Sequence, residues 1–267
     1  MAEGYDTTSA LHESFDGIAE AYDRARPAYP RAVFDRILAH ADCQHAPADI
    51  LEIGTGTGKA TRVFAELGHR LLCLEPGPNL ARFAREQFAA LPNVVVEQVS
   101  FEHWTPGDRR FDIAFVAQAF HWLDPDLRLD KLASVLRPGG TVAVFGHSST
   151  MAPSQLGEAI QTAYRVHAPA LEQRDNARLW YSSRQSPVWA ELNASPRFGD
   201  LDFHAFEWAR DLSPEAFCEL LATYSDHATL PTEQRRVLLE ALAEAVRQNG
   251  GVARIEYTTA LFLARAC

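Results

Sequence analysis

Cysteine is scarce in this sequence, and the few cysteines present are not closely spaced. Cys43, Cys73, Cys218 and Cys267 fit neither a zinc site nor a disulfide framework, so we expect reduced, mostly buried thiols. The histidines show no metal-ligand spacing either. We therefore predict that the protein binds no metal.

Long apolar runs are also missing. The longest apolar-leaning run, residues 111–123, is too short and too polar to span a bilayer. The N-terminus, MAEGYDTTSA, lacks a basic start followed by an apolar stretch, so we expect no signal peptide. These two features predict a cytoplasmic protein with no membrane partner.

Positive charge is in deficit. The chain has 25 lysines and arginines against 35 acidic residues, for a formal net charge of −10. A nucleic-acid binder needs a positive surface that displaces phosphate counterions, and this balance disfavours one. A small molecule is the more economical partner. The length of 267 residues suits one large α/β domain, or a domain with a sizeable insertion.

What the sequence does contain is a regular alternation of short apolar runs and helical segments between residues 49 and 146. Strands alternating with helices at this spacing indicate βαβ units around a parallel sheet, and the unbroken apolar runs indicate strands covered on both faces. The expected strands are residues 50–54, 70–76, 93–99, 111–118 and 141–146, and the expected helices are 30–41, 57–68, 78–90 and 125–136.

The regular alternation of strands and helices ends after Gly146. Residues 151–200 read as mainly helical and irregular and are rich in aromatics. Further strands are expected at 202–210 and 255–264, and further helices at 213–224 and 230–248. The prediction is therefore a Rossmann-like α/β fold. It has a seven-stranded, mostly parallel sheet with helices on both faces and a helical insertion.

A glycine-rich turn, EIGTGTG at residues 52–58, joins the first strand to its helix. A dinucleotide-binding turn would need glycine at position 59, where Lys59 stands, and a phosphate loop would need glycine at 53 and a hydroxyl residue at 60. Those positions hold Ile53 and Ala60. Both phosphate-binding interpretations fail, which leaves a turn for a nucleoside without a pyrophosphate.

An acidic residue, Glu75, closes the second strand. In Rossmann-like units an acidic side chain at this place hydrogen-bonds ribose hydroxyls. A solvated carboxylate at a strand end is the alternative. The glycine turn upstream favours the role in cofactor binding.

Four segments together resemble the class I S-adenosylmethionine-dependent methyltransferases: LEIGTGTGKAT, LEPGPNL, FDIAFVAQAFHWLD and LRPGGTVAVFG. The similarity is greatest to the small-molecule branch that includes trans-aconitate methyltransferase-like proteins. It covers residues 15–146 well, and ATYSDH at 222–227 and the closing YTTALFLARA more weakly.

The resemblance implies S-adenosylmethionine as the cofactor. The glycines of the turn would line its methionine and ribose portions, Glu75 would hold the ribose hydroxyls, and Arg26 would pair with the methionine carboxylate. An ordinary surface ion pair remains the alternative for Arg26. The implied cofactor-binding residues are Tyr22, Arg26, Gly54, Thr55, Gly56, Gly58, Glu75, Pro76, Leu80, Ser100, Phe101 and Gln118.

Residues after the fourth strand are the expected place of chemistry, because ligands bind at the carboxyl ends of such strands. His121 is the candidate catalytic residue, as a general base or an acceptor-orienting group, with a structural histidine as the alternative. The Asp/Asn-Pro-Pro-Tyr/Phe motif of nucleobase methyltransferases is absent here, where AQAFHW stands. The expected acceptor contacts are Tyr29, His121, Trp122, Trp180, Tyr181, Tyr224 and His227.

The predicted organisation has four parts: an N-terminal helical lid at 1–47, the cofactor-binding core at 48–150, a helical cap over the acceptor pocket at 151–200, and a completion of the sheet at 201–267. The expected activity is methyl transfer to a small-molecule acceptor. Oxygen is the favoured acceptor atom, with a carboxylate among the candidates, and nitrogen and carbon stay open. A catalytically silent cofactor-binding regulator or partner subunit is the alternative, and Lys59 disfavours a nicotinamide-dependent oxidoreductase. Acceptor identity and the choice between monomer and homodimer stay open.

Overall fold

A computed structural model of the chain describes residues 19–171, 181 and 183–267. The chain forms two compact units. The first, here called the sheet unit, comprises residues 28–148, 177–206 and 259–267. The second, the helical unit, comprises residues 1–27, 149–176 and 207–258. The four-part organisation expected from the sequence stays a prediction.

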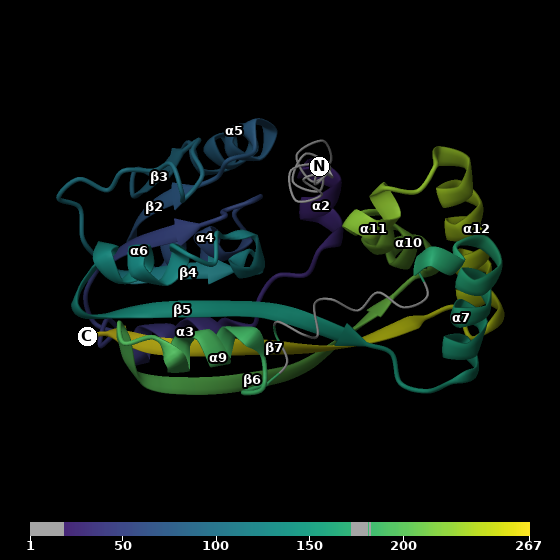
Figure 1. The fold of residues 1–267 in the computed structure, drawn as a ribbon. Helices are drawn as coiled ribbons and strands as arrows, with labels where there is room; N and C mark the ends of the chain where they lie inside the picture. The colour runs from purple at the N-terminus through teal and green to yellow at the C-terminus, as the bar shows by residue number, and fades with distance from the viewer. Residues whose placement is uncertain (1–18, 172–180, 182) are drawn as a thin grey trace, which may run out of the picture. The chain divides into compact units, whose positions relative to one another are not determined.

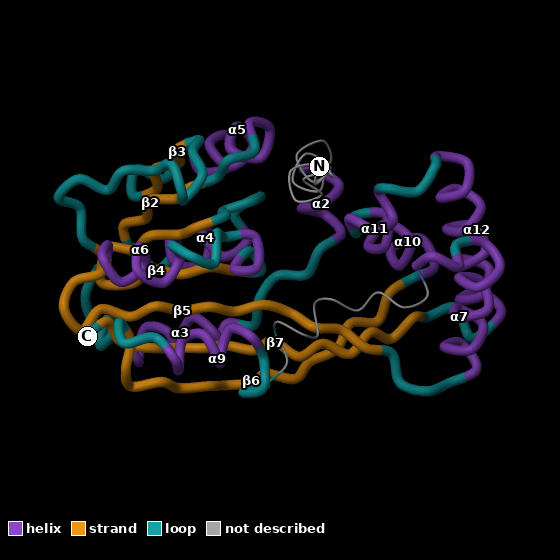
Figure 2. Tube along the Cα trace, viewed as in Figure 1, coloured by secondary structure: helices purple, strands orange, loops and turns teal. Residues whose placement is uncertain are grey.

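One seven-stranded sheet has the order β3-β2-β1-β4-β5-β7-β6. The pairs β1/β2, β1/β4, β2/β3 and β4/β5 are parallel, which confirms the predicted mostly parallel sheet. Its strands, drawn in orange in Figure 2, are β1 (Asp49–Ile53), β2 (Arg70–Leu74), β3 (Val94–Glu97), β4 (Phe111–Ala117), β5 (Leu136–Thr150), β6 (Phe198–Leu212) and β7 (Ala253–Ala266).

Alternate residues of the central strands enter two separate cores, as the two-residue period of a strand requires. Leu51 of β1 packs in one core and Ile50 in the other, and both are fully buried. Helices α3 (Arg31–His40) and α4 (Lys59–Glu66) contribute to the second core, and α6 (Arg128–Val135) and α9 (Pro187–Ala194) to the first. Helix α5 (Pro78–Phe88) follows β2. Helices therefore cover both faces, as predicted.

The helical unit has its own apolar core. Its helices are α2 (Ala19–Ala25), α7 (Gln155–His167), α10 (Pro214–Ala222), α11 (Ser225–Ala228) and α12 (Thr232–Gln248), with a short 3-10 turn η2 (Pro169–Leu171). Helices α7 and α12 lie side by side (Figure 1). Ser213 caps α10 by accepting a hydrogen bond from Ala216 N–H, as the Ser-Pro start of that segment predicts.

Most predicted element boundaries differ from those observed by a few residues, and the largest difference is at β5. The strand expected at 141–146 is the middle of the longer β5, which begins at Leu136, where the expected helix was to end. The register between β4 and β5 shifts between Phe111 and Ile113, because Gly139 and its neighbours bulge out of the strand. None of the helices in the described ranges is long and apolar enough to cross a membrane.

Candidate functional site

The turn between β1 and α4 is held by the main chain of β2. The N–H groups of Gly54 and Thr55 both donate to the Leu74 carbonyl, at 2.9 and 3.1 Å. Gly54, Gly56 and Gly58 have φ angles of 74°, 57° and 84°. These angles lie in the left-handed region that favours glycine, which explains the spacing of the three glycines.

The glycine turn is packed at its two ends and open in the middle. A Cβ atom at Gly54 would lie 2.8 Å from the Cβ of Ala119, and one at Gly58 would lie 2.3 Å from a ring carbon of Phe88. A Cβ at Gly56 would meet no atom of the described residues within 4 Å. The turn is therefore open at Gly56, and any side chain there would enter this space, here called the cradle.

Glu75 joins the glycine turn to the end of β2. Its carboxylate accepts hydrogen bonds from Gly56 N–H at 2.7 Å and from Gly77 N–H at 2.9 Å. The side chain is buried, so these two bonds fix its orientation. Binding of ribose hydroxyls by Glu75 stays a prediction. The same carboxylate also holds the shape of the turn, through its hydrogen bond from Gly56 N–H.

The hydrogen bonds of the turn decide whether it can bind a phosphate group. In a phosphate-binding loop the main-chain N–H groups point at the ligand. Here the N–H of Gly56 is bonded to Glu75 and that of Gly58 to the Thr55 carbonyl at 2.9 Å. A phosphate at this turn would face a carboxylate and would lack these donors. The turn fits a nucleoside that carries no phosphate, as S-adenosylmethionine does.

A buried hydroxyl in the same turn supports this fit. Thr57 is 3% exposed, and its Oγ1 has no hydrogen-bond partner among the residues that the structure describes. Buried polar groups are normally hydrogen-bonded, so an unpaired one in a turn open at Gly56 marks a place where a ligand completes the bonding.

Glu52, in the middle of β1, lies buried beneath the turn. Burial raises the pKa of its carboxyl to about 8, although hydrogen bonds from the Thr61 hydroxyl and the Cys73 thiol act to lower it. The carboxyl is therefore largely protonated at neutral pH. The sequence analysis missed this residue. Its signal is an acidic residue between the apolar residues of β1, whose sequence is DILEI.

The residues expected to contact adenine lie near the ends of β2 and β3. Leu80 on α5 is buried and Pro76 is exposed. The Ser100 hydroxyl bonds to His103 Nδ1 at 2.9 Å, and the ring of Phe101 is buried in the core of the sheet unit. Their adenine contacts stay predictions.

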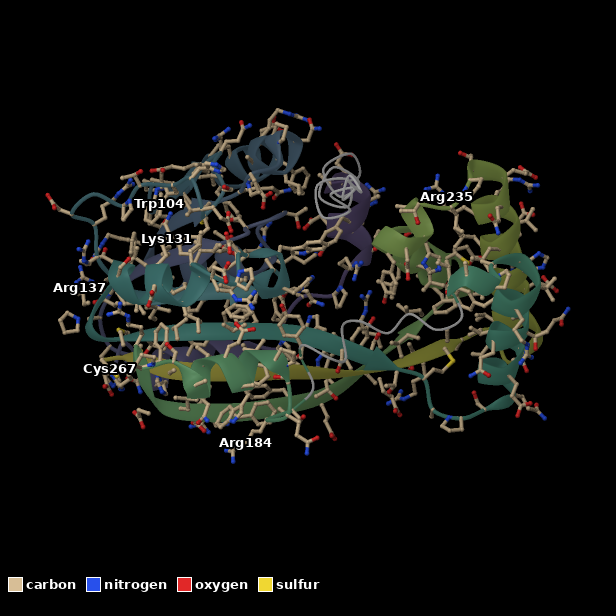
Figure 3. All side chains as sticks on the ribbon, viewed as in Figure 1. Trp104, Lys131, Arg137, Arg184, Arg235 and Cys267 are labelled. Carbon is tan, nitrogen blue, oxygen red and sulfur yellow. The ribbon has the colours of Figure 1, made fainter. Side chains whose placement is uncertain are left out.

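Lys131 holds in place the loop after β3 that contains Glu102 and Trp104. Its Nζ donates to the carbonyls of Glu102 and Trp104 at 2.9 and 2.7 Å (Figure 3). The same ammonium lies 5.1 Å from the centre of the Phe101 ring. Lys131 therefore ties the loop after β3 to helix α6.

Gln118, at the end of β4, clamps the end of β5. Its backbone has φ 59°, an uncommon value for a residue other than glycine. Its side-chain amide donates to the His147 carbonyl at 3.1 Å and accepts from the His147 N–H at 2.9 Å. This pair of bonds was not predicted. The expected place of Gln118 beside the methionine portion of the cofactor stays a prediction.

His121 and Trp122 lie in a 3-10 turn, η1 (Phe120–Trp122), directly after β4. The ring centres of the two residues are 4.7 Å apart, and His121 Nδ1 lies 3.4 Å from the hydroxyl of Tyr181. Tyr181 is fully buried against Gly146, and burial raises the pKa of its hydroxyl well above the usual range. The structure thus brings three of the expected acceptor contacts together, while Trp180 lies outside the described residues.

Tyr29 stacks on a histidine that the sequence analysis left out. The rings of Tyr29 and His147 are 4.4 Å apart, and His147 Nδ1 bonds to the Thr259 hydroxyl at 2.8 Å. His147 also bonds to the side chain of Gln118, so it links the end of β4 to the later part of β5 and to the middle of β7. Its position in the buried half of β5 gave no signal in the sequence.

The predicted lid residues Tyr22 and Arg26 belong to the helical unit. Arg26 donates from Nε to the Thr223 hydroxyl at 2.9 Å and from Nη2 to the Thr223 carbonyl at 3.0 Å. Its guanidinium lies 4.1 Å from the ring centre of Tyr224 and 5.2 Å from that of Tyr22. Pairing of Arg26 with the methionine carboxylate stays a prediction.

His227, the last of the expected acceptor contacts, is buried in the same unit. Its Nδ1 lies 2.7 Å from an Asp226 carboxylate oxygen, and its Nε2 lies 2.8 Å from the Tyr164 hydroxyl. Tyr164 was not predicted as a site residue. Across the parts of the chain that the structure describes, no three His, Cys, Asp or Glu side chains are placed to hold a metal ion.

Comparison with known proteins gives consistent results. A family model described as a methyltransferase domain matches residues 50–140. The chain is 29% identical over 243 residues to an uncharacterized methyltransferase of Mycobacterium tuberculosis (strain ATCC 25618 / H37Rv), covering 90% of this chain and 88% of that protein. It is 31% identical over 166 residues to the malonyl-[acyl-carrier protein] O-methyltransferase of Serratia marcescens, covering 60% of this chain and 62% of that protein.

A solved structure extends the similarity to the fold. A candidate type II methyltransferase from Anaeromyxobacter dehalogenans superposes with a TM-score of 0.63 at 27% identity, covering 90% of this chain and 97% of that one. The expected likeness to the trans-aconitate branch stays a prediction. These similarities support a class I S-adenosylmethionine-dependent methyltransferase, with S-adenosylmethionine as its cofactor.

Proposed function

We propose that this methyltransferase acts on a small molecule and transfers the methyl group to an oxygen atom, with a carboxylate as the favoured acceptor. The likeness to a malonyl-[acyl-carrier protein] O-methyltransferase supports oxygen as the acceptor atom. The net charge of −10 and the AQAFHW segment after β4 argue against a nucleic-acid acceptor. S-adenosylmethionine supplies a methyl carbon activated by positively charged sulfur.

The single observation that carries the proposal is the place of His121. Ala119, two residues before His121, lies against Gly54 of the glycine turn, and His121 follows the carboxyl end of β4, the edge where ligands bind in such sheets. An imidazole there can either take a proton from a hydroxyl acceptor or donate a hydrogen bond to a carboxylate.

The hydrogen bonding around Tyr181 favours the second role. Tyr181 keeps its proton because burial raises the pKa of its hydroxyl, and its oxygen interacts with the Phe120 backbone. When the hydroxyl donates to Nδ1 of His121, the ring proton resides on Nε2. A donating Nε2–H suits a carboxylate acceptor, which needs no general base.

The experiment is a metabolite screen with S-adenosylmethionine labelled in the transferring methyl group, read by mass spectrometry. Products are then treated with alkali. A carboxylate acceptor gives a methyl ester, whose label is released as methanol, whereas a methyl ether or an N-methyl product keeps the label. Alkali-stable product alone would overturn the carboxylate proposal.

Variants of His121 test its role in the same assay. Loss of one hydrogen bond to a charged group costs about 1.5–3 kcal/mol, so His121→Ala should lower kcat/KM for the acceptor at least about tenfold. His121→Asn keeps a side-chain N–H donor and should recover part of that loss, while adenosylhomocysteine affinity stays unchanged. Equal activity of His121→Ala and the wild type would exclude the role.

A catalytically silent cofactor-binding protein, acting as a regulator or partner subunit, is the alternative. It predicts adenosylhomocysteine binding without label transfer to any acceptor in the screen. Transfer to one acceptor excludes it.

A further inference from the structure

Three side chains of the helical unit form a continuous hydrogen-bonded chain. Asp226 Oδ1 lies 2.7 Å from His227 Nδ1, and His227 Nε2 lies 2.8 Å from the Tyr164 hydroxyl. The His227 main-chain N–H also donates to Asp226 Oδ1, at 2.7 Å. The imidazole is 3% exposed, so its two ring nitrogens are committed to these partners.

Charge sets the direction of the hydrogen bonds in this chain. Burial acts to raise the pKa of Asp226, but the hydrogen bonds from His227 outweigh it and hold that pKa below its usual range. An ionised Asp226 accepts the proton of Nδ1–H, and in a neutral imidazole Nε2 is then the accepting nitrogen. Burial raises the pKa of Tyr164, so its hydroxyl keeps a proton and donates it to Nε2. The Tyr164 oxygen then offers only lone pairs to any further partner.

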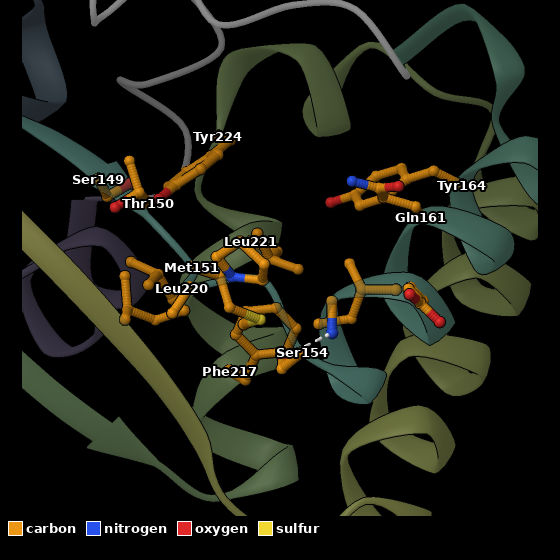
Figure 4. A pocket seen from close by; sticks show the side chains of 16 residues that line it. Ser149, Thr150, Met151, Ser154, Gln161, Tyr164, Phe217, Leu220, Leu221 and Tyr224 are labelled. Carbon is orange, nitrogen blue, oxygen red and sulfur yellow. Dashed lines mark hydrogen bonds between the residues drawn. The ribbon is translucent and has the colours of Figure 1, made fainter.

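Tyr164 also lines a pocket of about 490 Å³ whose lining residues all belong to the helical unit. In Figure 4, Tyr164 and Tyr224 stand on opposite sides of the pocket, with Leu220, Leu221 and Phe217 between and below them in this view. Apolar side chains form the larger part of the walls, and the polar side chains among them are Ser149, Thr150, Ser154, Glu158, Gln161, Tyr164 and Tyr224. This composition is typical of sites for small molecules.

We propose that this pocket binds a compact, mainly apolar molecule whose hydroxyl or amine group donates a hydrogen bond to the Tyr164 oxygen. The chain from Asp226 through His227 is a positioning device, because it orients Tyr164 as an acceptor. The proposal concerns binding to the helical unit and does not rest on the proposed O-methylation.

Charge at the pocket disfavours an anionic ligand. The exposed Glu158 carboxylate belongs to the lining, and a ligand carboxylate would meet both this charge and the accepting oxygen of Tyr164. Arg26, the nearby cation on the ring of Tyr224, donates to Thr223 and is not among the lining residues. A neutral or cationic donor is the complementary group.

Calorimetry with the full-length protein and three probes of similar size tests the proposal. The probes are 4-propylphenol, 4-propylanisole, in which a methyl group replaces the hydroxyl hydrogen and removes the donor, and 3-phenylpropanoate, which carries a carboxylate. The phenol should bind about two- to tenfold more tightly than the anisole, the effect of one net hydrogen bond, and more tightly than the carboxylate. Equal affinity for all three, or a preference for the carboxylate, would overturn it.

Two variants and a matched control test whether the probes bind in this pocket and whether the phenol bonds to Tyr164. Tyr164→Phe should bind the phenol and the anisole equally, whereas Tyr257→Phe, a buried tyrosine of the same unit outside the pocket, should keep the preference. Ile160→Trp places a larger ring in the pocket and should abolish binding of both probes. A preference for the phenol that survives in Tyr164→Phe, or unchanged binding in Ile160→Trp, would place the ligand elsewhere and contradict the proposal.

Discussion

The carboxylate of Glu75 accepts a hydrogen bond from the main-chain N–H of Gly56 at 2.7 Å, which ties the end of β2 to the middle of the glycine turn. Gly56 is also where the turn is open to a ligand. The acidic residue predicted to bind ribose therefore also holds the backbone of the cradle. Loss of the carboxylate should affect both the shape of the site and its contact with cofactor.

Substitution of Glu75 tests this coupling. Charge-assisted hydrogen bonds contribute about 1.5–3 kcal/mol each, so Glu75→Ala should weaken adenosylhomocysteine binding by at least about tenfold. Glu75→Gln keeps an accepting oxygen and should lose less. Titration calorimetry gives the affinities, and Glu66→Gln, at an exposed position of α4, serves as the control. Wild-type affinity in Glu75→Ala would show that the carboxylate holds neither turn nor ligand.

Alanine at Gly56 should reduce cofactor affinity more than stability. The new methyl group would meet no described atom but would occupy the cradle. Gly107→Ala is a matched control, since Gly107 has φ 59° against 57° for Gly56 and is equally open. Both variants should unfold at similar temperatures, because both carry the same backbone strain. If Gly56→Ala binds adenosylhomocysteine as tightly as Gly107→Ala does, the ligand does not occupy this cradle.

Alanine at Gly58 should instead destabilise the fold. Its Cβ would lie 2.3 Å from the Phe88 ring, at a residue with φ 84°. Overpacking of this kind costs about 1–3 kcal/mol, so urea unfolding should show a lower midpoint than for Gly56→Ala. The reverse order of the two midpoints would contradict the packing described here.

The buried Glu52 predicts a pH dependence of stability. Its pKa is about 8 in the folded chain, against an ordinary value of 4.5. Between these values the folded chain holds a proton that the unfolded chain has released, so this group lowers the free energy of unfolding as pH rises. The loss of stability begins near pH 4.5 and is complete above about pH 8.

Glu52→Gln removes the titrating group and keeps the shape. Urea midpoints measured from about pH 5 to about pH 8 should fall more steeply for the wild type than for this variant. Parallel curves for the two proteins would mean that Glu52 is ionised in the folded state.

The sheet was predictable from the sequence because its signals are local. Each central strand is a short, mostly apolar run such as DILEI, and each turn carries its own glycine or proline. The phosphate-free character of the turn could be inferred from Lys59 and Ala60 alone, and the internal bonds of Gly56 and Gly58 now support it.

The side-chain hydrogen bonds of the site and of the helical unit depend on contacts between residues far apart in the chain. The amide clamp between Gln118 and His147 and the chain from Asp226 to Tyr164 each join distant segments, which no local pattern encodes. The bulge in β5 shifts its register against β4, which is defined only once the two strands are paired. Side-chain roles in the helical unit could therefore not be derived from the sequence.

Titration calorimetry of the full-length protein with S-adenosylhomocysteine, and separately with NAD, tests the central claim most directly. A turn whose N–H groups are bonded to Glu75 and the Thr55 carbonyl should bind the adenosyl thioether and give no heat with the diphosphate. Heat with NAD and none with adenosylhomocysteine would contradict it.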